Sequence, residues 1–146
     1  MALLAPQGGD LGRLAQLVAK TNQFTLDQPR HSEAELAAIV ADGKHAVRLV
    51  RAADRFGDYG VIGAFIVHEG RLDTFVLSCR AMGRGIEDAM LAAAGEGAGG
   101  TLTVTVHAGA RNVPARSFFE RFGAGAGSDQ RITTPAWPSF VRREEG

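Results

Sequence analysis

The sequence predicts an α/β protein built on a mixed, mostly antiparallel sheet flanked by helices. Apolar residues recur at helical spacing in some segments and alternate or run continuously in others, and glycines separate these segments. Tight loops join the first predicted strands, which makes them antiparallel, whereas a helix connects the next pair, which makes that pair parallel. The 146 residues suffice for one core, so we expect a single domain over residues 1–146.

Two helices are predicted before the first strand. Asp10 is expected to cap the first, over residues 11–21, whose leucines share one face. Ser32 is followed three residues later by Glu35, which is the pattern of a capping box, and Gly43 ends this second helix. The polar segment between the two helices is expected to be a connection.

Three strands follow, at residues 45–53, 61–70 and 71–79. A glycine-containing loop over residues 54–60 joins the first two as a hairpin. The third strand has a continuous apolar centre, so both of its faces are expected to be buried.

The second half of the chain alternates helices with strands. We expect a helix at 85–97, a strand at 101–108 and a helix at 112–123 with Asn112 as its N-cap. The tail at 131–143 contains two prolines and is expected to form one or two edge strands.

Charge and composition exclude several classes of protein. The formal net charge is zero, which argues against nucleic-acid binding through a broad basic face. The longest apolar run, Val61 to Val67, is far shorter than the roughly 20 residues that span a bilayer, and the first residues lack the basic region of a signal peptide. Cys79 is the only cysteine and the four histidines are scattered, so we expect no disulfide, no metal site and a cytoplasmic location.

The stretch "SCRAMGRGIEDAM" joins the third strand to the next helix through glycines. Such a turn presents backbone N–H groups at the positive end of the helix dipole, which is an arrangement that binds phosphate. Arg80 and Arg84 add positive charge next to Gly83 and Gly85. The alternative is a tight strand–helix turn with solvated arginines.

Four motifs in order resemble one known family. They are "KTNQFTL" (20–26), "RFGDYGVIG" (55–63), "DTFVLSCRAMGRGIEDAML" (73–91) and "ARNVPARSFFERFG" (110–123). Together with the order of elements they are similar to the GNAT acyltransferase fold, and most of all to the C-terminal acyltransferase-like domain of FkbH-type proteins. In those proteins a phosphatase-like domain, absent from this sequence, loads a glyceryl unit onto an acyl carrier protein for polyketide assembly.

The resemblance implies a sheet that splays where it binds the pantetheine arm of acetyl-CoA, acyl-CoA or a carrier protein. The backbone of Leu77 to Cys79 would pair with that arm as an added strand, Asn112 would face it, and the glycine turn would hold its phosphates. The residues expected to bind the donor are therefore Leu77, Ser78, Cys79, Arg80, Gly83, Arg84, Gly85 and Asn112. Asn22, Gln23 and Phe24 would shape the acceptor pocket, or else serve as helix caps and a core aromatic.

Two features depart from the general GNAT pattern. The motif Arg/Gln-x-x-Gly-x-Gly/Ala fits from Arg80, but an alignment anchored on the following helix places Met82 at the basic position and Glu87 where a small residue belongs. Glu87 would then repel a pyrophosphate. Phe119 stands where many GNAT enzymes have a tyrosine that protonates the leaving thiolate, and its helical spacing favours a place in the core.

Three further side chains are weighed as catalytic groups. Asp73 is a candidate general base, with an ordinary strand-end acid as the alternative. His107 ends a strand beside the expected cleft and is the histidine to test first. Cys79 has no neighbouring histidine in the sequence and is expected to be a buried strand cysteine.

The sequence therefore predicts acyl transfer from a coenzyme A or carrier-protein thioester to a small acceptor in natural-product biosynthesis. The alternative is a non-catalytic module that docks a carrier protein, which Phe119 and Glu87 favour. The oligomeric state, including a homodimer, stays open.

Overall fold

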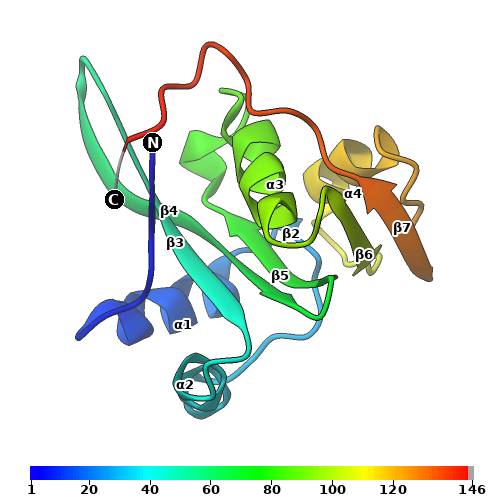
Figure 1. Cartoon of the computed structure of the whole chain (residues 1–146), viewed down its shortest axis with the longest axis horizontal. Coiled ribbons are helices and arrows are strands. Elements are labelled where there is room, and N and C mark those ends of the chain that lie inside the picture. The colour runs from blue at the N-terminus through cyan, green and yellow to red at the C-terminus, as the bar shows by residue number, and fades with distance from the viewer. Residues whose placement is uncertain (145–146) are drawn as a thin grey trace.

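We describe the fold from a computed structural model of the chain, which describes residues 1–144 (Figure 1). In chain order its elements are β1 (Ala2–Leu4), α1 (Asp10–Lys20), β2 (Phe24–Thr25), α2 (Glu33–Ala41), β3 (Ala46–Asp54), β4 (Gly57–His68), β5 (Arg71–Leu77), a 3₁₀ turn (Cys79–Ala81), α3 (Ile86–Glu96), β6 (Thr101–Thr105), α4 (Val113–Glu120) and β7 (Asp129–Thr133). None of the helices formed by the described residues is long and apolar enough to cross a membrane.

The strands form one mixed sheet in the order β1-β3-β4-β5-β6-β7, and β2 pairs with β5 off this path. Every neighbouring pair is antiparallel except β5 and β6, which are parallel and joined through α3. The predicted mixed, mostly antiparallel sheet with flanking helices is thus confirmed, including its one parallel connection.

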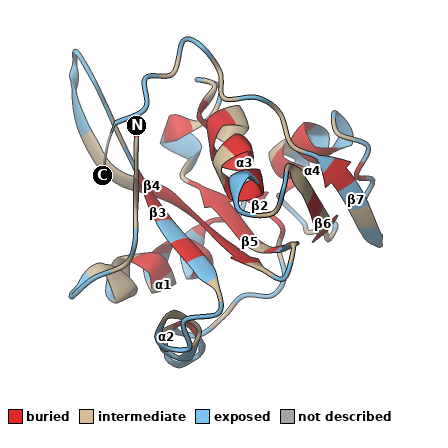
Figure 2. Cartoon of the chain, in the orientation of Figure 1, coloured by how far each residue is buried: buried red, intermediate tan, exposed pale blue. Residues whose placement is uncertain are grey.

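Both faces of the sheet are covered, and the centre of the molecule is buried (Figure 2). On one face α1 and α2 pack against residues such as Val76, while on the other α3 and α4 pack against Phe75 and Leu77. These three consecutive residues of β5 are each at most 1% exposed, because neighbouring side chains of a strand point to opposite faces. The prediction that this strand is buried on both faces is confirmed.

A cluster of phenylalanines fixes α4 to the sheet. The Phe119 ring is fully buried, 5.5 Å from the Phe75 ring and 5.1 Å from the Phe118 ring. Phe24 packs edge-on against Phe118, with 5.3 Å between ring centroids. Burying each ring stabilises the fold by about 1.5–3 kcal/mol. The core position expected for Phe119 is confirmed.

The first two helices differ in how they begin. Ser32 and Glu35 form the predicted capping box, in which each side chain accepts a hydrogen bond from the other's backbone N–H. Asp10, by contrast, is the first residue of α1, and Gly9 is the N-cap. The prediction of Asp10 as the cap is wrong by one residue, because its carboxylate accepts instead from the Gln7 N–H at 2.9 Å.

The hairpin between β3 and β4 is longer than predicted. The two strands pair up to Asp54 opposite Gly57, so Arg55 and Phe56 alone lie in the turn. The Tyr59 hydroxyl donates a hydrogen bond to the Asp54 carboxylate at 2.8 Å across the hairpin. A cross-strand bond of this kind extends the ladder through residues whose types suggested a loop.

Two strands that the sequence did not predict, β1 and β2, have only three and two residues. Segments so short show no periodicity, and their partners decide their conformation. Other elements end early: β5 stops at Leu77, β6 at Thr105 and α4 at Glu120.

The C-terminal tail runs back across the molecule after one edge strand. β7 is the only strand of the described tail, and from Thr134 the chain crosses over α3 and returns to β1 (Figure 1). The Trp137 indole N–H donates to the Val141 carbonyl at 2.6 Å, and the Glu144 N–H donates to the Met1 carbonyl at 2.9 Å. The prediction of one or two edge strands is therefore partly right: β7 is an edge strand, but the described tail forms no strand around Pro135 and Pro138.

Candidate functional site

The end of β5 opens into a concavity of about 280 Å³ that we call the α1 concavity. Helix α1, the loop after it, the residues at the end of β5 and one residue before α4 form its walls. These residues are Arg13, Gln16, Leu17, Lys20, Thr21, Asn22, Gln23, Leu77, Ser78, Cys79 and Arg111. The structure thus brings together residues predicted separately for the acceptor and for the donor.

Several polar side chains of the α1 concavity have no partner within the chain. Among residues 1–144, no hydrogen bond or ion pair is made by the side chains of Lys20, Asn22, Gln23, Ser78 and Arg111. Sequence reasoning missed the cations. Arg13 and Lys20 lie seven residues apart on α1, two helical turns, which is a signal that could have been read; Arg111 has no comparable local signal.

Phe24 does not line this concavity. Its ring is 2% exposed and belongs to the phenylalanine cluster. Of the two alternatives for Phe24, the core aromatic is confirmed.

Cys79 lies outside the strand and is exposed with a free thiol. The expectation of a buried strand cysteine is wrong, because β5 ends two residues earlier and the chain turns into a 3₁₀ helix. In that turn the Ser78 and Cys79 carbonyls accept from the N–H groups of Ala81 and Met82.

The space where β5 and β6 diverge, which we call the wedge, is filled by another segment of the same chain. β5 and β6 pair at only two positions, and β2 pairs with β5 beyond them, placing Phe24 opposite Leu77. On its other side this segment receives a hydrogen bond from the His107 N–H to the Leu26 carbonyl at 3.1 Å. We call residues 23–26 the wedge segment.

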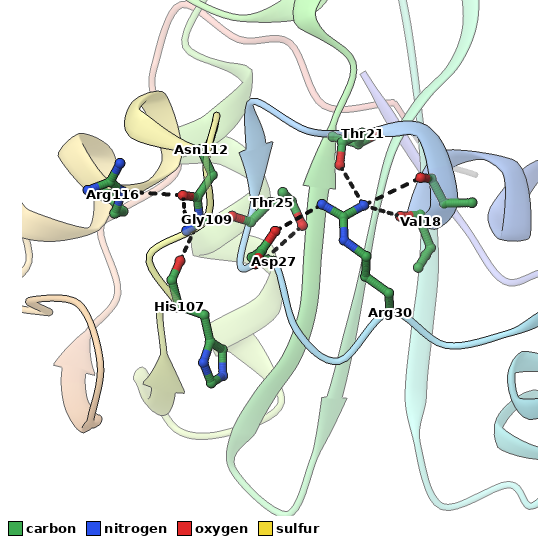
Figure 3. Close-up of polar contacts among 10 residues, drawn as sticks. Val18, Thr21, Thr25, Asp27, Arg30, His107, Gly109, Asn112 and Arg116 are labelled. Carbon is green, nitrogen blue, oxygen red and sulfur yellow. Dashed lines mark hydrogen bonds and ion pairs between the residues drawn. The ribbon is translucent and has the colours of Figure 1, made fainter.

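Asn112 holds the wedge segment in place (Figure 3). Its Nδ2 donates to the Thr25 carbonyl at 3.1 Å and to the His107 carbonyl at 2.7 Å, while its Oδ1 accepts from the Gly109 N–H and the Arg116 Nε. The fully buried amide has then used both donors and both acceptor sites. Asn112 occupies the predicted N-cap position of α4, but its side chain does not cap the helix.

Asp27 and Arg30, which come after the wedge segment in the sequence, connect it to α1 (Figure 3). The Arg30 guanidinium donates to the carbonyls of Val18 and Thr21 at 3.2 and 3.1 Å and forms an ion pair with Asp27 at 3.0 Å. These contacts satisfy carbonyls at the end of α1 that have no helical partner.

The backbone of Leu77 and Ser78, which was expected to pair with the ligand, is already paired within the chain. Leu77 already has Phe24 on one side and Gly63 on the other, and the Ser78 N–H donates to the Ile62 carbonyl at 2.7 Å. An extended ligand that paired with Leu77 would have to remove the wedge segment, with the buried Phe24 ring.

The glycine turn is occupied by a carboxylate of its own helix. Glu87 Oε2 accepts from the Gly83 N–H at 2.8 Å, at the place where the sequence predicted a phosphate. Gly85 is the N-cap of α3 with φ of 82°, and a Cβ there would lie 2.4 Å from the Phe140 ring of the tail. The left-handed backbone conformation therefore favours glycine, whereas the exposed Phe140 ring could move aside.

The two arginines of the turn reach toward the β3–β4 hairpin. Arg80 donates to the Tyr59 carbonyl at 3.1 Å, and Arg84 lies 3.8 Å from the Asp54 carboxylate and over the Tyr59 ring. Hydrogen bonds from the Tyr59 hydroxyl and the Phe56 N–H lower the pKa of Asp54, so it stays ionised opposite Arg84. A second concavity of about 520 Å³ lies between the hairpin, the turn and the tail.

The two predicted catalytic groups do not meet. Asp73 Oδ1 lies 2.8 Å from His31 Nε2 and accepts from the Thr74 hydroxyl at 2.7 Å, while His31 Nδ1 is buried without a hydrogen bond. The His107 ring points away from Asn112 (Figure 3). Neither Asp73 nor His107 lines the two concavities, and within residues 1–144 no group of acidic, histidine and cysteine side chains is placed to hold a metal ion.

No protein-family model, no curated protein and no solved structure matches the chain.

Proposed function

We propose that this domain transfers an acyl group from a thioester to a small acceptor, and that the reaction takes place in the α1 concavity. One observation carries the proposal. The end of β5, predicted to contact the acyl donor, and Asn22 and Gln23, predicted to shape the acceptor pocket, line the same concavity. The thioester would be coenzyme A or the phosphopantetheine arm of an acyl carrier protein, as the resemblance to GNAT acyltransferases implies.

The donor arm would lie against Ser78 and Cys79 rather than along the edge of β5. The wedge segment holds that edge at Leu77, and its removal would expose Phe24, which is worth about 1.5–3 kcal/mol of burial. An arm that enters the concavity meets exposed polar side chains instead.

For this reaction the protein has to position the acceptor and the thioester and to stabilise the charge that develops between them. The acceptor's amine or hydroxyl attacks the thioester carbonyl, a bond from the acceptor to the acyl carbon forms, and the carbon–sulfur bond breaks. The thiolate takes up the proton that the acceptor loses, through water, because the buried Phe119 cannot donate one. Neutral polar groups around the concavity stabilise the negative charge that develops on the carbonyl oxygen and the sulfur.

A second function is favoured by the other side of β5. Glu87 fills the glycine turn, Asn112 has no hydrogen-bonding capacity left, and Arg80 is already bonded to the hairpin. Because these groups already make their hydrogen bonds within the chain, they suit a module that docks a carrier protein without transferring its acyl group.

Thiol release separates the two functions. Acetyl-CoA and an acetyl-phosphopantetheinylated carrier protein are each mixed with the domain and a set of small amines and hydroxy compounds, and free thiol is followed over time. Ser78→Trp fills the concavity and should lower the rate at least about tenfold, a loss of roughly 1.4 kcal/mol of transition-state stabilisation. Ser117→Trp, on the exposed side of α4, is the matched control and should not change it.

The outcomes are distinct. Thiol release that depends on an acceptor supports the transferase, and binding of the carrier protein without thiol release supports the docking module. If neither thioester binds the wild-type protein at millimolar concentration, both functions are wrong.

A further inference from the structure

The α1 concavity is lined by three cationic side chains and no acidic one. Arg13 and Lys20 come from α1 and Arg111 from the loop before α4, and the remaining lining residues are neutral. The whole chain has a formal net charge of zero, so this local excess of positive charge is not a property of the protein at large.

The three cations have no acidic partner within the described residues. The Arg13 guanidinium donates to two neutral oxygens, Gln16 Oε1 and the Val61 carbonyl, both at 2.9 Å. Lys20 and Arg111 make no ion pair among residues 1–144. Arg71 and Arg121, in contrast, each bond a carboxylate of the chain.

The two hydrogen bonds of Arg13 also fix where its charge lies. One joins Arg13 to Gln16 within α1 and the other joins α1 to the Val61 carbonyl of β4, so the guanidinium is held at the wall of the concavity. Lys20 and Arg111 are exposed and carry long side chains that can close over a ligand. A fixed cation and two adjustable ones form a site suited to one or two anionic oxygens.

Neutral polar groups lie beside the cations. Asn22, Gln23 and Ser78 supply side-chain donors and acceptors that no described residue uses. They are suited to orient an amine or hydroxyl toward a thioester carbonyl near Ser78. The volume of about 280 Å³ is at the small end of ligand sites, which limits the acceptor to a few heavy atoms.

We infer that the acceptor is a small anionic molecule, with a carboxylate or phosphate group held by Arg13, Lys20 and Arg111 and a nucleophilic amine or hydroxyl directed toward Ser78. The inference rests on the proposed function for the transfer step. The binding of an anion in the concavity stands apart from that step and can be tested without turnover.

The first experiment compares acceptors that differ in one anionic group. Glycine is compared with glycinamide, and phosphoethanolamine with ethanolamine, in the thiol-release assay with acetyl-CoA and the acetylated carrier protein. The anionic member of each pair should have a kcat/KM at least about tenfold higher. The two pairs also show whether a carboxylate or a phosphate is preferred.

Matched variants locate the effect. The double variant Lys20→Gln/Arg111→Gln should abolish the preference for the anionic member. The double variant Lys44→Gln/Arg55→Gln removes the same charge from exposed positions outside the concavity and should keep it. Equal rates for charged and neutral acceptors, or an unchanged preference in the first variant, would overturn the inference while leaving acyl transfer intact.

The second experiment measures binding alone. Backbone amide spectra are recorded during titration with glycine and with phosphoethanolamine, and the shifts of Ser78, Cys79 and Asn22 are followed. An anion should move these signals with a dissociation constant about tenfold weaker in Lys20→Gln/Arg111→Gln and at higher salt, because solvent ions screen exposed charges. Anion binding without thiol release would reject the proposed transfer but keep the anion site; shifts absent up to tens of millimolar, or unaffected by the variant, would reject the site.

Discussion

The two sides of β5 differ in whether their polar groups have hydrogen-bond partners within the chain. On the α3 side, the glycine turn and the wedge segment are satisfied within the chain, by Glu87 on the Gly83 N–H and by the Asn112 amide. On the α1 side, Lys20 and Arg111 have no such partner among the described residues. Residue types pointed to the glycine turn on the first side as the phosphate site, whereas the geometry leaves the second side open for a ligand.

Asn112→Ala should have the largest effect, because it tests whether the α3 side is structural. The variant leaves the Thr25 and His107 carbonyls and the Gly109 N–H without their partner in a buried setting. Each unsatisfied buried group costs about 1–3 kcal/mol, so we expect a loss of at least about 3 kcal/mol in the free energy of unfolding. Urea denaturation measures it.

Asn22→Ala is the control for the open side. Its side chain is exposed and makes no bond with residues 1–144, so its unfolding free energy should stay within about 0.5 kcal/mol of the wild type. Similar losses in the two asparagine variants would remove the distinction between the sides.

Glu87→Gln should make the glycine turn on the α3 side accessible to a phosphate group. The change removes the negative charge from the glycine turn, and pyrophosphate or coenzyme A should then bind there about tenfold more tightly. Calorimetry compares the variant with the wild type and with Glu120→Gln, an exposed acid on α4. Unchanged affinity in Glu87→Gln would mean that the turn is no phosphate site even when it is vacant.

Asp129→Asn tests the base of the wedge, where β5 and β6 are still paired. Hydrogen bonds from Arg71 and then Thr105 lower the pKa of Asp129 from 3.8 to about 2. Because the folded state favours the ionised form, this contribution to stability is complete above about pH 4 and is lost as the pH falls toward 2.

The difference in melting temperature between wild type and Asp129→Asn should therefore shrink between about pH 4 and pH 2. Arg71→Gln removes the strongest cause of the shift and should show the same convergence. A gap that stays constant over this range would show that the pair with Arg71 does not act through ionisation.

Cys79→Ala should have the smallest effect. The thiol is exposed at the rim of the open side, so the unfolding free energy should change by less than about 0.5 kcal/mol. Thiol release should continue, because no described histidine pairs with Cys79 to activate it as a nucleophile. A folded but inactive variant would make Cys79 a nucleophile.

Much of this fold follows from local patterns. The capping box of Ser32 and the buried strand around Phe75 were readable because periodicity and capping depend on neighbours in the sequence. The parallel pairing of β5 with β6 followed from the helix between them.

The site was less predictable, because its parts meet only in the folded chain. That β2 fills the wedge depends on partners such as Leu77, Asn112 and Ala115, which are far apart in sequence. Arg111 reaches the α1 concavity from the other half of the chain. The position of Cys79 was mispredicted because one 3₁₀ turn ended the strand early.

A crystal structure with the product of transfer to glycine, N-acetylglycine, tests the central claim most directly. Our account predicts the molecule in the α1 concavity, with its carboxylate within hydrogen-bond distance of Arg13, Lys20 or Arg111 and its acetyl group beside Ser78. A product bound at the glycine turn near Gly83 and Arg84, or a concavity still empty at a concentration that saturates binding in solution, would contradict it.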